Sequence, residues 1–148
     1  MRRDLDVIDH RILKELESDG RLSIVELATR INLTNTPCSE RVKRLEKSGY
    51  ISGYRAELNM DKLGLSHLTV VQVSLAVTGG TDSLDDFNKA IAKIPEVEKC
   101  LMLAGSFDYL LIVRTRDMRQ FREVLGDSIN KIPGIMQTSS FSVMEVVK

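Results

Sequence analysis

Apolar positions recur at helical spacing through the first third of the chain, and the later part alternates between strand and helix patterns. Three short helices are expected in the first part, over residues 6–16, 23–31 and 36–48. Aspartates near the start of the first helix favour a helix N-terminus. Ser23 and Glu26 have the spacing of a capping box, and Asn32 follows as a tight turn. Three short helices, the last two joined by a short turn, predict a helix-turn-helix unit.

The third predicted helix has clear sequence signals at both ends. Thr36 is the expected N-cap, Pro37 suits the first helical position, and Gly49 suits the left-handed residue after the last turn. One face of this helix is apolar and carries Cys38, Val42 and Leu45. The opposite side is polar and basic, with Thr36, Ser39, Glu40, Lys43, Arg44 and Lys47. This division suits a helix that packs by its back and enters a DNA major groove by its front. Basic stripes also occur on helices that contact nothing but solvent, so the context of the helix decides.

The next segment connects this unit to the rest of the chain. Residues 50–56 have strand character and include Arg55, which predicts a small wing beside the third helix. Residues 59–64 are polar and contain a glycine, which is typical of a hinge. The expected domains are therefore 1–58 for DNA binding, a hinge over 59–66, and 67–148 for effector binding and oligomerisation.

The second part predicts two strand-helix-strand units. Strands are expected over residues 67–77, 97–103, 108–115 and 136–147, and Gly79-Gly80 should end the first one. Helices should begin at Asp82 and Asp117, with Met118 on the inner face of the second helix. The order βαββαβ predicts a ferredoxin-like sandwich behind a winged helix-turn-helix, and the fold class is α+β. Because the first strand is apolar on both faces, a second copy of the sheet should cover one of them, which predicts a homodimer.

Composition restricts the classes of partner. Hydrophobic residues make up 43% and charged residues 28%, and the formal net charge is zero. Between Ser39 and Arg55, five basic residues face two acidic ones, while the chain from Asp61 onward has ten basic and eleven acidic residues. Binding of DNA by one copy should therefore be weak, and two or more copies would be needed for a tight phosphate footprint.

Hydrophobic runs, cysteines and histidines indicate where the protein is located and whether it binds a cofactor. The N-terminus has no apolar signal segment, and no run approaches the length of a membrane span, so a cytoplasmic protein is expected. Cys38 and Cys100 lie in apolar patterns and are expected to be buried thiols. With only two histidines, the chain shows no metal-ligand spacing, and no cofactor is predicted.

Several motifs, in this order, resemble the Lrp/AsnC family of feast/famine regulators over nearly the whole chain. They are Leu5-Asp6 with Ile8-Asp9 and Ile12-Leu13, Asp19-Gly20-Arg21, Glu26-Leu27-Ala28, Thr36-Pro37-Cys38, Arg41-Val42, Arg44-Leu45-Glu46, Gly49-Tyr50-Ile51, Gly53-Tyr54, and Gly105-Ser106-Phe107-Asp108-Tyr109-Leu110-Leu111. Residues 41–46 and 105–111 look most like the leucine-responsive branch of that family. The resemblance implies a transcription regulator whose C-terminal domain senses an amino acid. It also implies dimers that build octamers, with the effector bound between sensor domains.

The DNA-binding candidates lie on and after the third helix. They are Asn35, Thr36, Ser39, Glu40, Lys43, Arg44, Lys47 and Arg55. Arg44 or Lys43 can donate to guanine edges, and Asn35 or Ser39 can reach bases or phosphates. Lys47 and Arg55 are expected at phosphates. The alternative is that Glu40 and Lys47 only form pairs on the helix surface.

The effector-binding candidates centre on the turn 105–108. They are Met102, Gly105, Ser106, Asp108, Tyr109, Met118, Thr138 and Ser140. Peptide N–H groups beside Gly105 can hold a carboxylate, Asp108 can accept from an α-ammonium group, and methionines can supply an adaptable apolar wall. From the residues alone, an ordinary hairpin turn explains Gly105-Ser106 and a turn cap explains Asp108. The family resemblance favours the effector site.

An enzyme is the first alternative, and the sequence gives little support for it. His10 and His67 have no plausible catalytic partner nearby in the sequence, and Gly79-Gly80 lacks the lysine and spacing of a phosphate loop. The second alternative is an oligomeric amino-acid-binding module whose N-terminal helices only mediate assembly. A salt-dependent DNA-binding assay separates this module from a regulator.

Overall fold

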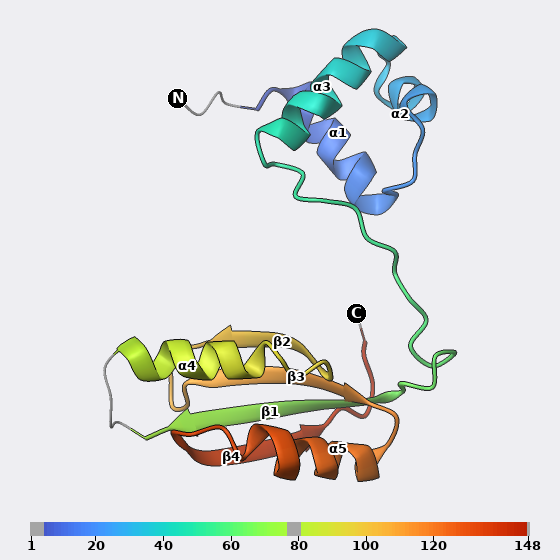
Figure 1. The fold of residues 1–148 in the computed structure, drawn as a ribbon. Coiled ribbons are helices and arrows are strands. Elements are labelled where there is room, and N and C mark those ends of the chain that lie inside the picture. Colours follow the sequence, from blue (N-terminus) through green and yellow to red (C-terminus); the bar gives the residue numbers. More distant parts are fainter. Residues whose placement is uncertain (1–4, 77–80, 148) are drawn as a thin grey trace. The chain divides into compact units, whose positions relative to one another are not determined.

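The computed structural model describes residues 5–76 and 81–147, and its contacts divide the chain after Leu58 into two compact units. The first unit contains three helices and the second a four-stranded sheet with helices (Figure 1). Each unit is described by itself. No helix in the described ranges combines the length and the apolar character that crossing a lipid bilayer requires.

The first unit packs three helices around one small core. The helices are α1 (Val7–Ser18), α2 (Ile24–Ile31) and α3 (Asn35–Lys47). The core consists of Ile12, Leu27, Ala28, Ile31, Cys38, Val42 and Leu45. The apolar face predicted for the third helix is therefore confirmed as its buried side.

Local capping explains where α1 and α2 begin and end. Asp6 caps α1 through a reciprocal pair with Asp9, in which each carboxylate accepts the other residue's backbone N–H. Ser23 and Glu26 form the predicted capping box of α2. Asn32 takes the left-handed conformation at φ 58°, which turns the chain toward α3.

The start of α3 corrects the prediction, and its end confirms it. Thr34, not Thr36, is the N-cap, and its side chain makes no capping hydrogen bond. Pro37 still lies in the first turn, where its missing N–H leaves no helical carbonyl without a donor. At the other end, Gly49 has φ 75°, and the Tyr50 N–H donates to the Leu45 carbonyl at 2.9 Å. The helix therefore closes with a left-handed glycine and back-bonded carbonyls.

The segment predicted to form a wing contains no strand. Residues 50–58 are irregular, so the strand expected over 50–56 is wrong in the described chain. Isolated extended segments need a neighbouring strand to supply hydrogen bonds, and this unit offers none. Tyr54 nevertheless ties the segment to α3, since its hydroxyl donates to Glu46 Oε1 at 2.9 Å. Burial and then this hydrogen bond raise the pKa of Tyr54 to about 12.

The second unit is an antiparallel sheet in the order β2-β3-β1-β4. The strands are β1 (His67–Leu75), β2 (Val97–Met102), β3 (Tyr109–Thr115) and β4 (Ile135–Ser142). In this order β3 lies between β1 and β2, and each neighbouring pair is antiparallel. The predicted ferredoxin-like βαββαβ topology is confirmed.

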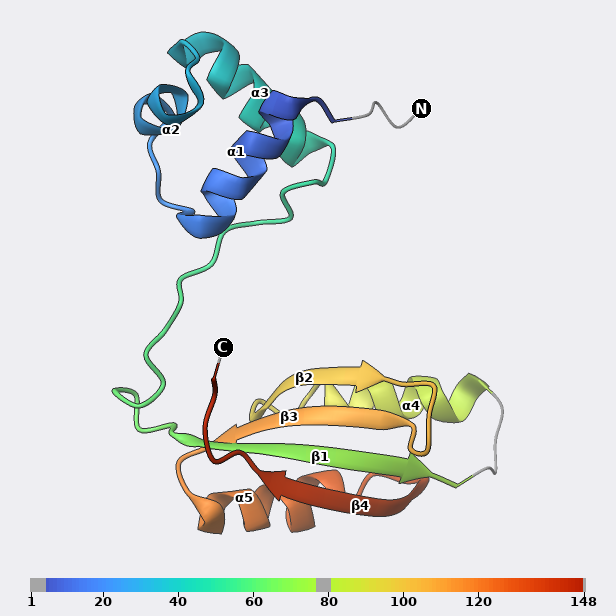
Figure 2. The ribbon, with the colours of Figure 1, turned by 180° about the vertical axis from the view of Figure 1, so that it is seen from behind.

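Two helices cover one face of this sheet and leave the other face open. They are α4 (Thr81–Ile91) and α5 (Met118–Val124), which continues as the π-helical turn η1 (Leu125–Ile129). Figure 1 views the sheet from the helical side and Figure 2 from the open side. The covered core includes Val71, Val73, Phe87, Ile91, Tyr109, Leu111, Val113, Phe121, Val124, Ile129 and Ile132.

Apart from shifts of one residue at other ends, two strand ends and one buried face of the second unit differ from the predictions. The last strand ends at Ser142 instead of Val147, because β1, its pairing partner, begins at His67. The strand expected to reach residue 77 ends at Leu75, and its predicted stop at Gly79-Gly80 lies outside the described residues. Met118 is 48% exposed instead of inward, because it begins the first turn of α5, whose buried residues are Phe121 and Val124.

Candidate DNA-binding face and effector turn

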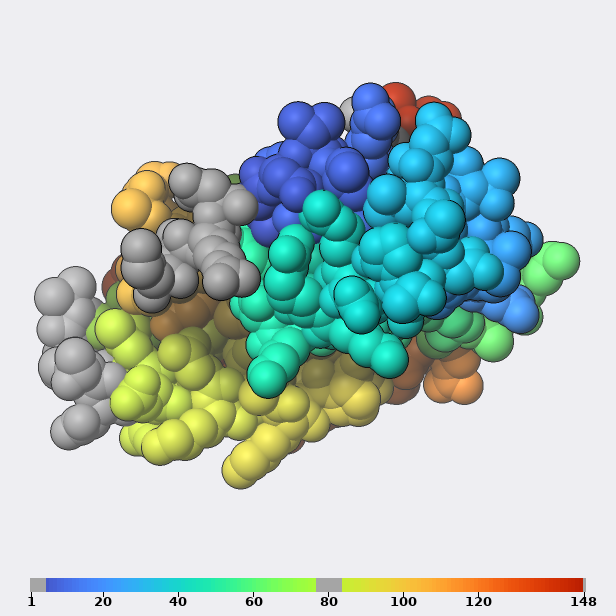
Figure 3. Space-filling model, turned by 90° about the horizontal axis from the view of Figure 1, so that it is seen from above, coloured from blue at the N-terminus to red at the C-terminus, as the bar shows by residue number. Residues whose placement is uncertain are grey.

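The front of α3 is an exposed polar surface. Its exposed members are Asn35, Thr36, Glu40, Lys43, Arg44 and Lys47, while Ser39 is half-buried. Figure 3 shows side chains of this segment, coloured cyan to blue-green, on the outside of the first unit. Arg55 is also exposed, on the irregular segment that follows α3. The predicted residues therefore lie where a nucleic acid can reach them.

A buried carboxylate on α1 binds two arginines of α3. The Asp9 side chain is 3% exposed, and its oxygens accept from Arg44 Nη2 at 2.6 Å and from Arg41 Nη1 at 2.8 Å. Arg41 also donates to Asp6 at 2.6 Å. The Asp9 backbone N–H, followed by Arg41, lowers the pKa of Asp6 below its ordinary value of 3.8.

This cluster changes two conclusions drawn from the sequence. Counting Asp6 and Asp9 with residues 39–55 lowers the local excess from three positive charges to one. The structure also directs Nη2 of Arg44 toward Asp9 of α1, so this part of the guanidinium is already bonded within the protein. Sequence reasoning missed Asp9 and Arg41 as site residues. The sequence did contain a signal, because residues four apart share one face of a helix. Asp9 is four residues from both Leu5 and Leu13, so this acidic residue lies on the apolar face of the first helix.

Lys43 and Lys47 are the remaining cations on the front of α3. Neither lysine forms an ion pair within the described ranges 5–76 and 81–147, and neither does Glu40. The surface pairing considered for Glu40 and Lys47 is therefore not formed among these residues. Two unpaired ammonium groups beside small polar side chains form a surface that can bind phosphate and base edges.

In the second unit, Asp108 joins the effector turn to the end of β1. Its carboxylate Oδ2 accepts the Leu75 N–H at 2.7 Å, and its own N–H donates to the Val73 carbonyl at 2.9 Å. The carboxylate therefore has a structural role, although it caps the end of β1 and not its own turn. Beside it, a Cβ added at Gly105 would meet no atom within 4 Å, so the packing of the described chain does not itself require a glycine there.

A small polar depression lies on the open face of the sheet next to this turn. Its volume is about 140 Å³, and it is lined by Gln72, Ser74, Ser106, Phe107, Gln137 and Ser139. Of the predicted hydroxyls, Ser106 lies here. Thr138 and Ser140 do not, because they pair with Val73 and Val71, whose side chains face the helices. Successive side chains of a strand point to opposite faces, so this alternation places Ser139, and neither of its two neighbours, on the face with the depression.

The other predicted effector residues divide into two beside the turn and one far from it. Tyr109 is buried at 1% exposure and stacks on Phe87, with ring centroids 4.5 Å apart, on the helix-covered side. Met118 follows the far end of β3, whereas Met102 is exposed at the end of β2 and pairs with Tyr109 where the turn begins. A single copy therefore brings together the turn residues, Met102 and the depression beside them.

These observations define a class of protein before any comparison. A helix-turn-helix with an exposed polar third helix is joined to a ferredoxin-like domain with a polar depression, which is the organisation of a ligand-responsive DNA-binding regulator. Models of two families match the chain: winged helix-turn-helix DNA-binding over residues 5–52 and Lrp/AsnC ligand binding domain over residues 69–148. The chain belongs to the Lrp/AsnC family of DNA-binding transcriptional regulators, which are not enzymes.

Individual relatives agree over nearly the full length. The proline dehydrogenase transcriptional activator of Rhizobium radiobacter is 50% identical, covering 98% of this chain and 92% of the relative. The leucine-responsive regulatory protein of Escherichia coli K12 is 46% identical, covering 99% of this chain and 88% of the relative. The structure of a Neisseria meningitidis transcriptional regulator in complex with L-Met superimposes with a TM-score of 0.93 at 34% identity, covering 98% and 93%.

Proposed function

We propose that this regulator reads a specific DNA sequence with the front of α3 and that an amino acid, bound near residues 105–108, controls its action. The observation that carries the first half is the division of α3 between a buried apolar back and an exposed front, whose two lysines form no ion pair with the described residues. In the proposal, residues 1–58 bind DNA, residues 59–66 connect the domains, and residues 67–148 sense the effector and assemble copies.

The roles on α3 follow from which groups are free. Lys43 is the donor to a guanine edge, since Arg44 is bound to Asp9. Arg41 and Arg44 orient the helix. The residues at its start, Asn35, Thr36 and Ser39, reach bases or phosphates, and Glu40 can accept from a cytosine amine. Lys47 and Arg55 contact phosphates.

The proposed DNA recognition by α3 is tested by measuring DNA affinity by fluorescence anisotropy, with a duplex selected from a random library. Lys43→Ala should weaken specific binding by about 5- to 150-fold. Lys93→Ala, an equal charge change at an exposed site of the second unit, is the matched control and should bind as the parent protein does. Equal affinity of Lys43→Ala and parent would contradict the assigned role. Absence of any salt-dependent binding by the parent would favour the assembly-only module instead.

The effector half rests on the turn and its open surroundings. Backbone N–H groups near Gly105 and Ser106 hold the carboxylate, and Asp108 accepts from the ammonium group. The 140 Å³ depression is smaller than the roughly 300–1,000 Å³ typical of ligand pockets, so a second copy completes the site. The complex of the Neisseria regulator with L-Met and the name of the leucine-responsive relatives support an amino acid as the effector class.

The open face of the sheet supports assembly. Val70 has Ile112 and Phe141 as its direct cross-strand neighbours, and Leu101 lies opposite Leu110. Phe141 is 53% exposed in one copy, so burying it against a second sheet removes apolar surface from water. We infer a homodimer built on this face, assembling further to an octamer, that acts in the cytoplasm. Light scattering coupled to gel filtration measures the state.

A further inference from the structure

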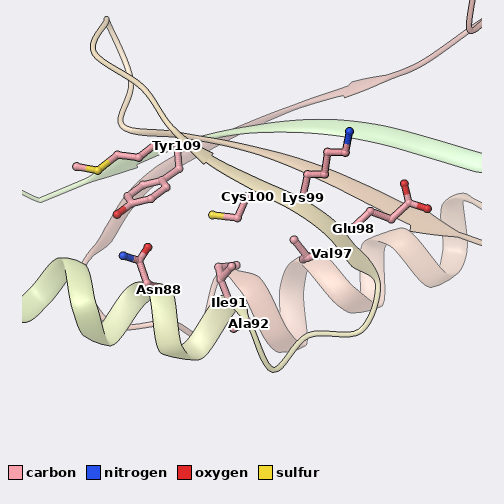
Figure 4. Close-up of a pocket in the computed structure, with 9 residues that line it drawn as sticks. Asn88, Ile91, Ala92, Val97, Glu98, Lys99, Cys100 and Tyr109 are labelled. Atoms are coloured by element: carbon pink, nitrogen blue, oxygen red, sulfur yellow. The ribbon is translucent and has the colours of Figure 1, made fainter. Parts of the chain in front are cut away.

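A second cavity lies on the opposite side of the sheet from the effector turn. It has a volume of about 440 Å³ and is lined by residues of α4, by β2 and by Tyr109 of β3. Figure 4 shows Asn88 and Ile91 of α4 and the following Ala92 on one side and Val97 and Cys100 of β2 on the other. Its size falls within the range of small-molecule sites.

One polar group at this cavity lacks the hydrogen bond that its burial demands. The Tyr109 residue is 1% exposed, and its hydroxyl has no hydrogen-bond partner among the described residues. Burial, followed by the Cys100 thiol, raises the pKa of Tyr109, while the Asn88 amide, as a loosely placed hydrogen-bond neighbour of the hydroxyl, lowers it. Figure 4 shows the hydroxyl directed toward Asn88, which sits on an exposed stretch of α4. Buried hydroxyls almost always make a hydrogen bond of good geometry, so this one can accept a better placed partner than Asn88.

The side chains that face the cavity are uncharged. Lys99 lines it by position, but its side chain extends to the other side of β2 in Figure 4. Glu98 is paired with Arg114. The inward groups are therefore a phenol, an amide, a thiol and aliphatic chains. An ionised ligand would gain no charged partner from these inward groups.

We propose that this cavity binds a small neutral molecule that carries an amide or another uncharged carbonyl on a short branched apolar body. The Tyr109 hydroxyl donates to the carbonyl oxygen, and the Asn88 side chain turns aside to bond the same polar group. The apolar body packs on Ile91, Ala92 and Val97. The cavity includes Met102 and Tyr109 but none of residues 105–108, whereas the depression beside the turn is lined by Ser106 and Phe107, so the two are separate sites.

Three probes with the same branched carbon skeleton test the charge preference. The full-length protein is titrated with 4-methylpentanamide, 4-methylpentanoate and L-leucine, and backbone amide NMR shifts are followed. The expected result is that the neutral amide shifts the signals of residues 88–92 and 97–102, while the carboxylate and the zwitterion leave them unchanged. No shift there with the amide, or an equal shift with the carboxylate, overturns the proposal.

Two variants test the assigned hydrogen bonds. Tyr109→Phe removes only an unpartnered hydroxyl, so the fold should persist while amide binding weakens about 5- to 10-fold. Asn88→Ala, at an exposed position, provides a second measurement with the same expected direction. Asp108→Asn is the matched control and should bind the amide normally, which separates this site from the proposed effector turn. Normal amide binding by both Tyr109→Phe and Asn88→Ala overturns the proposal.

Discussion

Arg44 of α3 donates from Nη2 to both carboxylate oxygens of Asp9 of α1 at 2.6 Å, although 35 residues separate them in sequence. Arg41 approaches the same carboxylate one helical turn earlier. Because Asp9 is buried and both arginines come from α3, the cluster fixes the rotation of that helix against α1. The exposed front of α3 then carries Lys43 and Lys47.

Removing the Asp9 carboxylate should loosen α3. Asp9→Ala is expected to lower the free energy of unfolding by about 1–3 kcal/mol, because it breaks two charge-assisted contacts and a reciprocal cap. The arginines are partly exposed and can turn to water, which limits the loss. Urea denaturation followed by far-UV circular dichroism measures the change. Asp127→Ala, which removes an exposed surface pair of η1, is the control and should change stability by less than about 0.5 kcal/mol.

The two capping carboxylates should make the first unit sensitive to acid. Hydrogen bonds to Asp9 and Arg41 lower the pKa of Asp6 from 3.8, and hydrogen bonds to Ser23 lower the pKa of Glu26 from 4.5. A carboxyl group with a lower pKa in the folded state stabilises the fold above its unfolded pKa. That stabilisation is lost as the pH falls through the folded pKa.

The predicted loss of stability at low pH can be tested with a variant that keeps the N-cap of α1 but has no titratable group at position 6. The melting temperature of the first unit is followed through the amide NMR signals of α1 at several pH values. Between about pH 5 and pH 2, this temperature should fall less for Asp6→Asn than for the parent protein. Asparagine is also a good N-cap, so helix α1 should still form at neutral pH. An unchanged acid dependence in Asp6→Asn would show that this carboxyl does not contribute.

At the effector turn, two substitutions of Asp108 separate charge from structure. Asp108→Asn keeps an oxygen to accept the Leu75 N–H, whereas Asp108→Ala leaves that donor without its partner. The alanine variant should lose about 1–2 kcal/mol of stability, and the asparagine variant should lose less. Both should lose the amino-acid response with DNA affinity nearly unchanged. A calorimetric titration with the common amino acids in which Asp108→Asn binds as the parent does would exclude the carboxylate as the ammonium acceptor.

The open face of the sheet gives a test of assembly. Phe141→Glu places a charge beside Val70 and should prevent a second sheet from covering that face, so the molar mass in solution falls toward one chain. Because Phe141 is 53% exposed in one copy, the fold of the isolated unit should persist. Met136→Glu, at another exposed position of β4, is the comparison variant. A parent protein that is already monomeric would contradict the proposed dimer.

Sequence patterns predicted most of the architecture, because the signals concerned are local. The capping box at Ser23 and Glu26, the closing glycine at Gly49 and the strand-helix order of the second half depend on nearby residues and on periodicity. The errors arose where the outcome depends on distant partners. Residues 50–56 have strand character but no neighbouring strand, and the last strand stops where β1 can no longer pair with it.

The sequence by itself determined the order of the elements, the family and the short list of polar groups, since each follows from spacing along the chain. Tertiary structure decided which of those groups are free. Arg44 is committed to Asp9, Asp108 to Leu75, and Thr138 donates its hydroxyl to Asn130. Hydrogen-bond partners are chosen by distance in space, and the segments that meet are separated by tens of residues. For that reason only the folded chain distinguishes Lys43 and Ser139 from neighbours of similar chemistry.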